Sequence, residues 1–154
     1  MNKALMFSSQ SDEWYTPQDL YDRLHAEFDF QIDLAATAEN KKCSAYYDMH
    51  DDSLAQDWMN ALGQRKRGWL NPPYSRGLCA KFIAKAAEER RKSFLTVMLL
   101  PARTDTKAFH AHIYDAEKWQ AREGVEIRLL PGRLKFGGCK DAAPFPSMVV
   151  VFRP

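Results

Sequence analysis

The sequence predicts an α/β fold with a mostly parallel sheet that helices cover on both faces. Segments with the spacing of strands alternate along the chain with segments that have the spacing of helices. Residues 94–100 are almost wholly apolar, as in a strand buried on both faces. A length of 154 residues, with 45% hydrophobic and 27% charged side chains, suits one globular domain with its own core. These three observations define the fold class.

The first half of the chain starts with a loose arm, residues 1–11. Thr16 is expected to cap a helix over residues 18–27, with Pro17 at the first helical position. Apolar and polar side chains then alternate over residues 28–35, which predicts a strand. Residues 44–47 are a candidate short strand, and residues 48–52 form an acidic loop.

The second half continues the alternation. Residues 68–70 form a short buried strand that two prolines end. The remaining elements are a helix over 78–91, the strand over 94–100, a helix capped by Thr104 or Asp105 that runs to 114, and strands over 125–130 and 147–152. No linker divides residues 12–154, so we expect a single domain.

Composition and charge exclude several classes of protein. A mean hydropathy of -0.50 and the lack of a long apolar run exclude a membrane protein and a signal peptide. The three cysteines form no C-x-x-C pair and the four histidines complete no zinc spacing, so we expect reduced thiols, no metal site and a cytoplasmic location. A formal net charge of +2 permits a nucleic-acid partner without requiring one.

Four short segments that carry polar residues, proline or glycine follow predicted strands. They are residues 33–36, 71–74, 101–104 and 132–136. In sheets of this class, ligands bind beyond the carboxyl ends of the strands. The four segments are therefore expected to meet at one edge and to form the functional site.

The segment Asn71-Pro72-Pro73-Tyr74 has the residue types needed to methylate an amine on a planar base. Such an amine is a poor nucleophile until acceptors hold its two N–H groups. An asparagine side-chain oxygen and a carbonyl beside a proline can do so, and the tyrosine ring offers a stacking face. This chemistry needs positioning but no metal and no covalent intermediate. The alternative is that the prolines merely end a strand and Tyr74 packs nearby.

The N-P-P-Y segment resembles the catalytic motif of class I S-adenosylmethionine-dependent amino-methyltransferases. The wider set of motifs is similar to the phage-type DNA N-6-adenine methyltransferases, in order and over residues 12–154. That set comprises Glu13-Trp14-Tyr15-Thr16-Pro17, Asp33-Leu34-Ala35-Ala36, Asp57-Trp58, Asn71-Pro72-Pro73-Tyr74-Ser75, residues 99–106 and Gly132-Arg133-Leu134-Lys135-Phe136.

The resemblance implies a Rossmann-like class I fold of reduced size, with S-adenosylmethionine as cofactor. The residues implied to bind the cofactor are Trp14, Thr16, Pro17, Asp33, Ala35, Asp52, Asp57 and Asn71. No glycine-rich loop follows the first strand, so residues 34–37 must form the cofactor cradle. Asp48 and Asp51 compete with Asp52 for the ribose hydroxyls, and Trp58 is either a stacking face for the cofactor's adenine or a core residue.

The resemblance also implies a catalytic set and a DNA-binding set. The catalytic residues are Asn71, Pro72, Pro73 and Tyr74, and those facing DNA are Ser75, Arg103, Arg133, Lys135 and Phe136. Phe136 would stack on the flipped base, with core packing as its alternative. Two cation runs, residues 65–67 and 90–92, are further candidates, and we favour the first as a DNA contact.

These inferences predict a DNA adenine-N6 methyltransferase that acts on double-stranded DNA, as a monomer or weak homodimer, in a bacterial host or phage-infected cell. The alternatives are the same chemistry on RNA adenine or protein glutamine, a non-catalytic nucleic-acid-binding module, and a structural domain with an accidental motif. No segment is long enough for a separate target-recognition domain, so we expect a short or relaxed target read by loops 103–106 and 133–140, or reliance on a second subunit.

Overall fold

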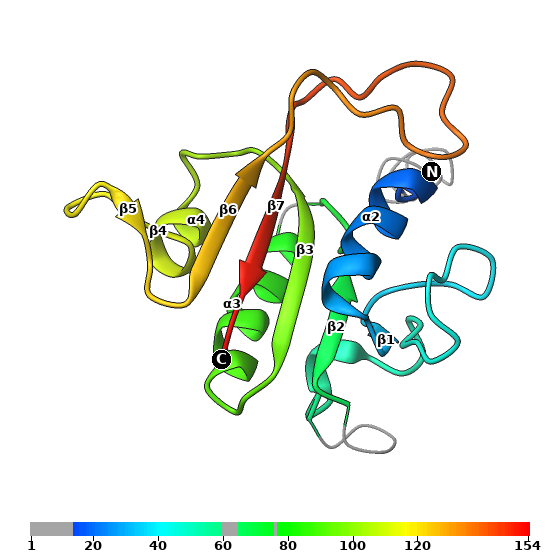
Figure 1. Ribbon diagram of the computed structural model, residues 1–154, viewed down its shortest axis with the longest axis horizontal. Coiled ribbons are helices and arrows are strands. Elements are labelled where there is room, and N and C mark those ends of the chain that lie inside the picture. The colour runs from blue at the N-terminus through cyan, green and yellow to red at the C-terminus, as the bar shows by residue number, and fades with distance from the viewer. Residues whose placement is uncertain (1–13, 60–64, 76) are drawn as a thin grey trace.

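The computed structural model describes residues 14–59, 65–75 and 77–154, so the expected arm over 1–11 lies outside the described residues. Its centre is a five-stranded sheet in the order β1-β2-β3-β7-β6 (Figure 1). The strands are β1 (Ile32–Asp33), β2 (Arg67–Leu70), β3 (Leu95–Pro101), β6 (Val125–Leu129) and β7 (Ser147–Phe152). The other elements are α2 (Gln18–Phe28), η1 (Ser53–Ala55), α3 (Leu78–Arg90), α4 (Lys107–His112) and the small hairpin β4 (Tyr114–Asp115) with β5 (Gln120–Ala121).

Strand directions place four carboxyl ends at one edge of the sheet. β1 pairs with β2, and β2 with β3, in parallel, with Asp33 opposite Trp69 and Leu70 opposite Met98. β7 runs antiparallel to both β3 and β6, so β6 points the same way as β1 to β3. The expected mostly parallel α/β sheet is therefore confirmed.

Side chains alternate between two cores, one on each face of the sheet. In β3, Met98 and Leu100 join the core under α3 and α4, whereas Val97 and Leu99 join the core under α2. Figure 1 shows α2 on the near face and α3 with α4 on the far face. Helices thus cover both faces, as the continuous apolar strands require.

Gly68 in β2 makes close packing possible on the α3 side. A Cβ at this position would lie 2.6 Å from the Leu34 Cδ1 and 2.9 Å from the Phe94 Cε1. Only glycine leaves room there for these two side chains.

Several element boundaries differ from the sequence prediction. The helix includes Phe28, because Asp29 closes it in the left-handed region at φ 54° and donates its N–H to the His25 carbonyl. The first strand therefore shortens to two residues, although Gln31 and Leu34 still donate N–H groups to β2 carbonyls. Residues 44–47 make only an isolated parallel bridge, from Tyr46 to Asp33.

Both predicted helix caps were wrong. Pro17 occupies the N-cap of α2 and Thr16 does not cap it. Thr106 caps α4, its hydroxyl accepting the Phe109 N–H at 3.3 Å, in place of Thr104 or Asp105. The β4–β5 hairpin after α4 was not predicted, since its two-residue strands carry no alternating pattern.

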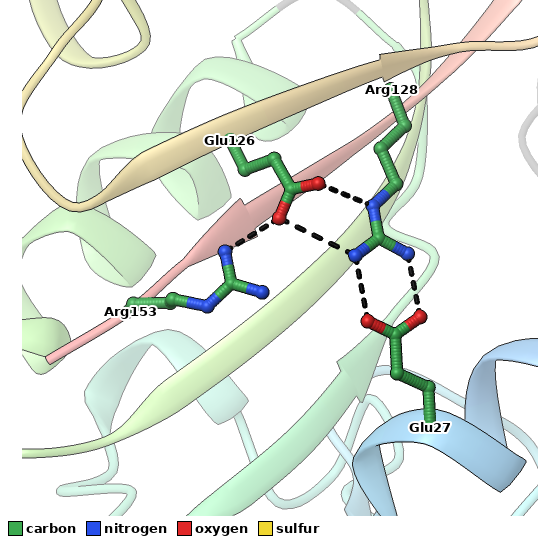
Figure 2. Close-up of polar contacts among 4 residues, drawn as sticks. All are labelled: Glu27, Glu126, Arg128 and Arg153. Carbon is green, nitrogen blue, oxygen red and sulfur yellow. Dashed lines mark hydrogen bonds and ion pairs between the residues drawn. The ribbon is translucent and has the colours of Figure 1, made fainter.

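An ion-pair network connects the C-terminal end of α2 with β6 and with the residue that follows β7 (Figure 2). Arg128 of β6 donates two hydrogen bonds of 2.7 Å to the Glu27 carboxylate and another of 2.7 Å to Glu126. Arg153, after β7, pairs with the other oxygen of Glu126. The two guanidinium groups also lie over the Phe28 ring, at 5.3 and 5.8 Å. These contacts fix the end of α2 against β6 and β7.

Candidate active site

A cavity of about 570 Å³ opens at the carboxyl edge of β1 and β2. Its walls come from the approach to α2 (residues 14–16), the turn after β1 (residues 33–38), the acidic loop (residues 47–50 and 52–54), and Asn71 with Pro73 after β2. Segments far apart in sequence thus meet at the edge where the strand directions predict a ligand site.

The Asn71 amide is held by three groups at this edge. Its Nδ2 donates to the Trp14 carbonyl and, at 3.0 Å, to the Thr16 Oγ1. Its Oδ1 lies 2.6 Å from the Tyr74 hydroxyl. A carbonyl can only accept a hydrogen bond, so the nitrogen must face Trp14 and the oxygen must face the other way.

Thr16 is accordingly buried, 6% exposed, with its hydroxyl engaged by Asn71. The sequence missed this contact because a Thr-Pro pair before a helix is the ordinary signal of a cap. Of the three residues of this segment expected to bind the cofactor, Trp14 and Thr16 line the cavity and Pro17 does not.

Tyr74 is buried, with its ring edge-on to Phe136 and Phe145 at centroid distances of 6.3 and 5.8 Å. Its hydroxyl lies within reach of two acceptors, the Asn71 Oδ1 and the Leu99 carbonyl, the latter at 3.0 Å. Burial raises the pKa of this hydroxyl well above its usual value, so it stays protonated. The expected open stacking face is not present in this conformation, because the neighbouring rings cover it.

Asp33 ends β1 at the wall of the cavity and is 3% exposed. Its carboxylate accepts the N–H groups of Ala35 at 3.3 Å and Lys42 at 2.9 Å. Burial raises its pKa to about 7 despite these two bonds. The Lys42 ammonium turns instead to the Gln18 side chain, 2.6 Å away. Among the described residues no cationic side chain pairs directly with this carboxylate, although the Lys42 charge still acts to lower its pKa. A buried carboxylate in such surroundings is suited to receive a cationic ligand.

The three carboxylates of the acidic loop differ in their hydrogen bonds and exposure. Asp48 and Asp51 turn toward the loop itself: Asp48 accepts the His50 N–H at 2.9 Å, and Asp51 accepts the Asp48 N–H at 2.8 Å. Asp52 lines the cavity, is exposed, and has a left-handed φ of 54°. Its carboxylate makes no cap bond to η1, whereas that of Asp48, which also lines the cavity, accepts hydrogen bonds within the loop.

Asp57 and Trp58 lie away from the cavity, contrary to the prediction. The Asp57 carboxylate accepts the Met59 N–H at 3.2 Å and lies 4.0 Å from the Lys92 ammonium. Trp58 is fully buried and donates its indole N–H to the Ser53 carbonyl at 3.0 Å. The alternative of a core tryptophan was the correct one.

The residues expected to face DNA divide into two groups. Arg103 is exposed at the carboxyl edge and donates to the Tyr74 carbonyl at 3.3 Å, beside half-buried Ser75. Arg133 and Lys135 are exposed in the loop after β6. Phe136 is 1% exposed and packs against the Trp14 ring at 5.4 Å, so core packing was the correct interpretation.

Two cation runs lie at the wrong edge of the sheet for a contact near Asn71. Residues 65–67 lead into β2, which starts at Arg67, and residues 90–92 lie between the end of α3 and β3, so both runs lie at the amino ends of parallel strands. The preference for the first run as a DNA contact stays a prediction, at the edge of the sheet opposite Asn71.

The loop between β6 and β7 completes the site, and sequence reasoning missed how. In Figure 1 this loop arches over the start of α2. Its Gly137 donates an N–H to the Tyr15 carbonyl at 2.8 Å, and its Phe145 packs on the Trp14 ring at 5.3 Å. The loop thereby holds the segment that carries the partners of Asn71.

The described part of the chain has neither a membrane-spanning helix nor a group of metal ligands. None of its helices is long and apolar enough to cross a bilayer. No three of its His, Cys, Asp or Glu side chains are grouped as ligands for a metal ion would be.

The chain is similar to known proteins along its whole length. A family model described as DNA N-6-adenine-methyltransferase (Dam) matches residues 3–154. A DNA N-6-adenine-methyltransferase of Escherichia phage T1 is 36% identical over 99 residues, which is 64% of this chain but 39% of the phage protein. The chain thus spans about two fifths of that relative's length.

Two further relatives extend the comparison. A putative methyltransferase, YfdM, of Escherichia coli K12 is 38% identical over 65 residues, 41% of this chain and 71% of the relative. A DNA N-6-adenine-methyltransferase of Haemophilus phage HP1 is 27% identical over 157 aligned positions, covering 100% of this chain and 86% of the phage protein. No solved structure matches. Because the family model covers nearly every residue, the chain belongs to the DNA N-6-adenine-methyltransferase (Dam) family.

Proposed function

We propose that this chain transfers a methyl group from S-adenosylmethionine to the N6 amine of adenine in DNA. Residues 12–154 would form one Rossmann-like class I methyltransferase domain. Family membership supports the reaction, and one structural observation carries the assignment: the Asn71 amide is fixed beside Pro73 at the wall of a ligand-sized cavity.

In the proposed reaction, the Asn71 Oδ1 and the Pro73 carbonyl accept the two N–H groups of the target amine. This holds the nitrogen lone pair out of the plane of the ring and toward the methyl donor. The cofactor supplies a methyl group activated on a sulfonium. With the cofactor bound, a nitrogen–carbon bond would form as the sulfur–carbon bond breaks, and one N6 proton would leave to solvent. The chain contributes position and hydrogen bonding, with no covalent intermediate on the protein.

The cavity suits this cofactor in size and charge. Buried Asp33 faces it with an elevated pKa and, within the described part of the chain, no direct ion pair, which suits a carboxylate that receives a cation. Asp52, exposed at the cavity wall, would accept the ribose hydroxyls, and the small side chain of Ala35 would permit close approach at the wall. Trp14 and Thr16 close the end of the cavity near Asn71.

The proposed nucleic-acid surface is the rim around Asn71. Exposed Arg103 is fixed next to the N-P-P-Y segment, and exposed Arg133 and Lys135 lie on the loop that covers Trp14 and Tyr15. Cations in these positions would bind phosphates on either side of a flipped adenine. The substrate we propose is double-stranded DNA with a short or relaxed target, bound by a monomer or a weak homodimer.

A labelled-cofactor assay tests this function. The purified chain is given double-stranded DNA, single-stranded DNA, RNA or a glutamine-containing protein, and the labelled product is identified by mass spectrometry. Wild type is expected to label N6 of adenine in DNA, and Asn71→Ala to lower the rate by about a hundredfold or more, because the amine loses an acceptor in the transition state. A protein that binds the cofactor but never labels adenine in DNA refutes the proposal.

A further inference from the structure

We infer that Thr16 is a positioning residue whose hydroxyl, together with the Trp14 carbonyl, holds the Asn71 amide in its catalytic orientation, rather than a cofactor ligand or a helix cap. The inference rests on the proposed function for its catalytic consequence, although the contact itself can be tested without activity. It assigns a role to a side chain 55 residues away from Asn71 in the sequence.

An asparagine amide at this site has two orientations that differ by a half-turn. In one, its oxygen can accept an N–H from the target amine. In the other, it offers an NH₂ group to an NH₂ group, and the target amine has no acceptor. The catalytic geometry therefore depends on what holds the amide in the first orientation.

The structure provides two acceptors on the nitrogen side. The Trp14 carbonyl takes one Nδ2 hydrogen and the Thr16 Oγ1, at 3.0 Å, takes the other. Both hydrogens of the amide are thus used inside the protein, and the Asn71 Oδ1 is left facing away from residues 14–16. A half-turn would place the Asn71 oxygen against the Trp14 carbonyl, which cannot donate, and would require the Thr16 hydroxyl to donate where it now accepts. The Trp14 carbonyl therefore sets the orientation, and the Thr16 hydroxyl adds the second bond that holds the amide in it.

Thr16 has no competing structural task in the described structure. It does not cap α2, because Pro17 occupies the N-cap and no side chain bonds there. Its side chain is buried, and Asn71 Nδ2 donates to its hydroxyl. The adjacent backbone is fixed from outside by the Gly137 N–H, which bonds the Tyr15 carbonyl at 2.8 Å. This hydrogen bond thus holds the backbone that carries the Thr16 hydroxyl in place beside Asn71.

The decisive experiment compares Thr16→Val with Thr16→Ser. Valine keeps the shape of threonine and removes the acceptor, whereas serine keeps the acceptor. If Thr16 positions Asn71, Thr16→Val lowers kcat about five- to tenfold, the loss of one hydrogen bond, with an unchanged Kd for S-adenosylmethionine by calorimetry. Thr16→Ser stays near wild type, and Thr16→Val adds no further loss to Asn71→Ala.

Several results would contradict the positioning role of Thr16. A Thr16→Val variant with a weaker Kd for the cofactor and an unchanged kcat makes Thr16 a cofactor ligand and overturns the inference. Equal losses in the Val and Ser variants, or losses that simply add to those of Asn71→Ala, also overturn it. Thermal melts of each variant separate these outcomes from loss of folding.

A spectroscopic test separates this inference from the proposed function. The Asn71 side-chain NH₂ signals, assigned in a nitrogen-15 NMR spectrum by their loss in Asn71→Ala, should shift in Thr16→Val and stay in Thr16→Ser. This result is expected even if the chain methylated no adenine. Unchanged Asn71 signals in Thr16→Val refute the positioning role whatever the activity assay shows.

Discussion

Replacing Asp33 by asparagine should make the ligand-free protein more stable at high pH while abolishing its affinity for the cofactor. Asp33 is 3% exposed, and burial raises its pKa from 3.8 to about 7. An acid whose pKa is raised by folding favours the neutral form in the fold. Stability from this group is therefore present below the unfolded pKa and is lost as pH rises through the folded one.

The magnitude follows from the size of the shift. At 1.36 kcal/mol for each pKa unit, ionised Asp33 lowers the free energy of unfolding by about 4 kcal/mol at pH 8. Asparagine removes that cost but has one acceptor oxygen for the two N–H groups of Ala35 and Lys42, which costs about 1 kcal/mol. The expected net gain is about 3 kcal/mol at pH 8 and near zero at pH 4.5, where Asp33 is neutral in the fold.

Urea unfolding of wild type and Asp33→Asn at pH 4.5, 6 and 8 measures this difference, with Asp52→Asn as the control because Asp52 is exposed at the same cavity. Calorimetry on the same samples should show that Asp33→Asn no longer binds S-adenosylmethionine. A stability difference that does not change with pH, or an Asp33→Asn protein less stable than wild type at pH 8, refutes the reasoning.

Three other predictions test separate parts of the structure. Gly68→Ala should lower the free energy of unfolding by about 1–3 kcal/mol in urea titrations, because its Cβ would lie 2.6 Å from Leu34. Glu126 has its pKa lowered to about 2 by arginine contacts, so its stabilisation is present above the unfolded pKa and is lost as pH falls toward 2. Glu126→Gln should remove that acid dependence, by about 1 kcal/mol or less at this partly exposed site, as thermal melts between pH 5 and 2 would show. Asp52→Asn should weaken cofactor binding about tenfold in calorimetry, whereas Asp57→Asn, outside the cavity, should leave it unchanged.

Short-range sequence patterns predicted those elements whose structure depends mainly on a short stretch of the chain. The apolar run before Pro101 and the short strand before Asn71 were found because burial on both faces leaves a compositional signal. The edge at which Asp33 and Asn71 meet followed from the strand directions. The same rule, applied to the cations of residues 65–67, would have placed them at the opposite edge, because they precede a strand.

The contacts that the sequence did not predict are those made between distant loops. The partners of Asn71 lie 57 and 55 residues before it, and no spacing rule relates a loop side chain to a carbonyl on another segment. The choice among Asp48, Asp51 and Asp52 likewise depends on the turn at Asp52, whose left-handed backbone has no reliable signal in a non-glycine residue. Burial of Phe136 was undecidable for the same reason, since an aromatic in a loop packs or projects according to neighbours distant in sequence.

The hydroxyl and the ring of Tyr74 differ in how easily they can adjust to a bound base. A tyrosine hydroxyl has one proton, and here it has two acceptors, the Asn71 Oδ1 at 2.6 Å and the Leu99 carbonyl at 3.0 Å. Donation to Leu99 needs only rotation about the C–O bond and leaves both lone pairs of the Asn71 oxygen for the target amine. Stacking on a base needs much more, because the ring is 4% exposed and packs against both Phe136 and Phe145. The hydroxyl can therefore adjust to a bound amine within the rigid site, whereas an aromatic face for the base requires the cover of loop side chains to move. Since that loop also carries Arg133 and Lys135, the proposed contact with a phosphate backbone and exposure of the Tyr74 ring would involve the same segment of the chain.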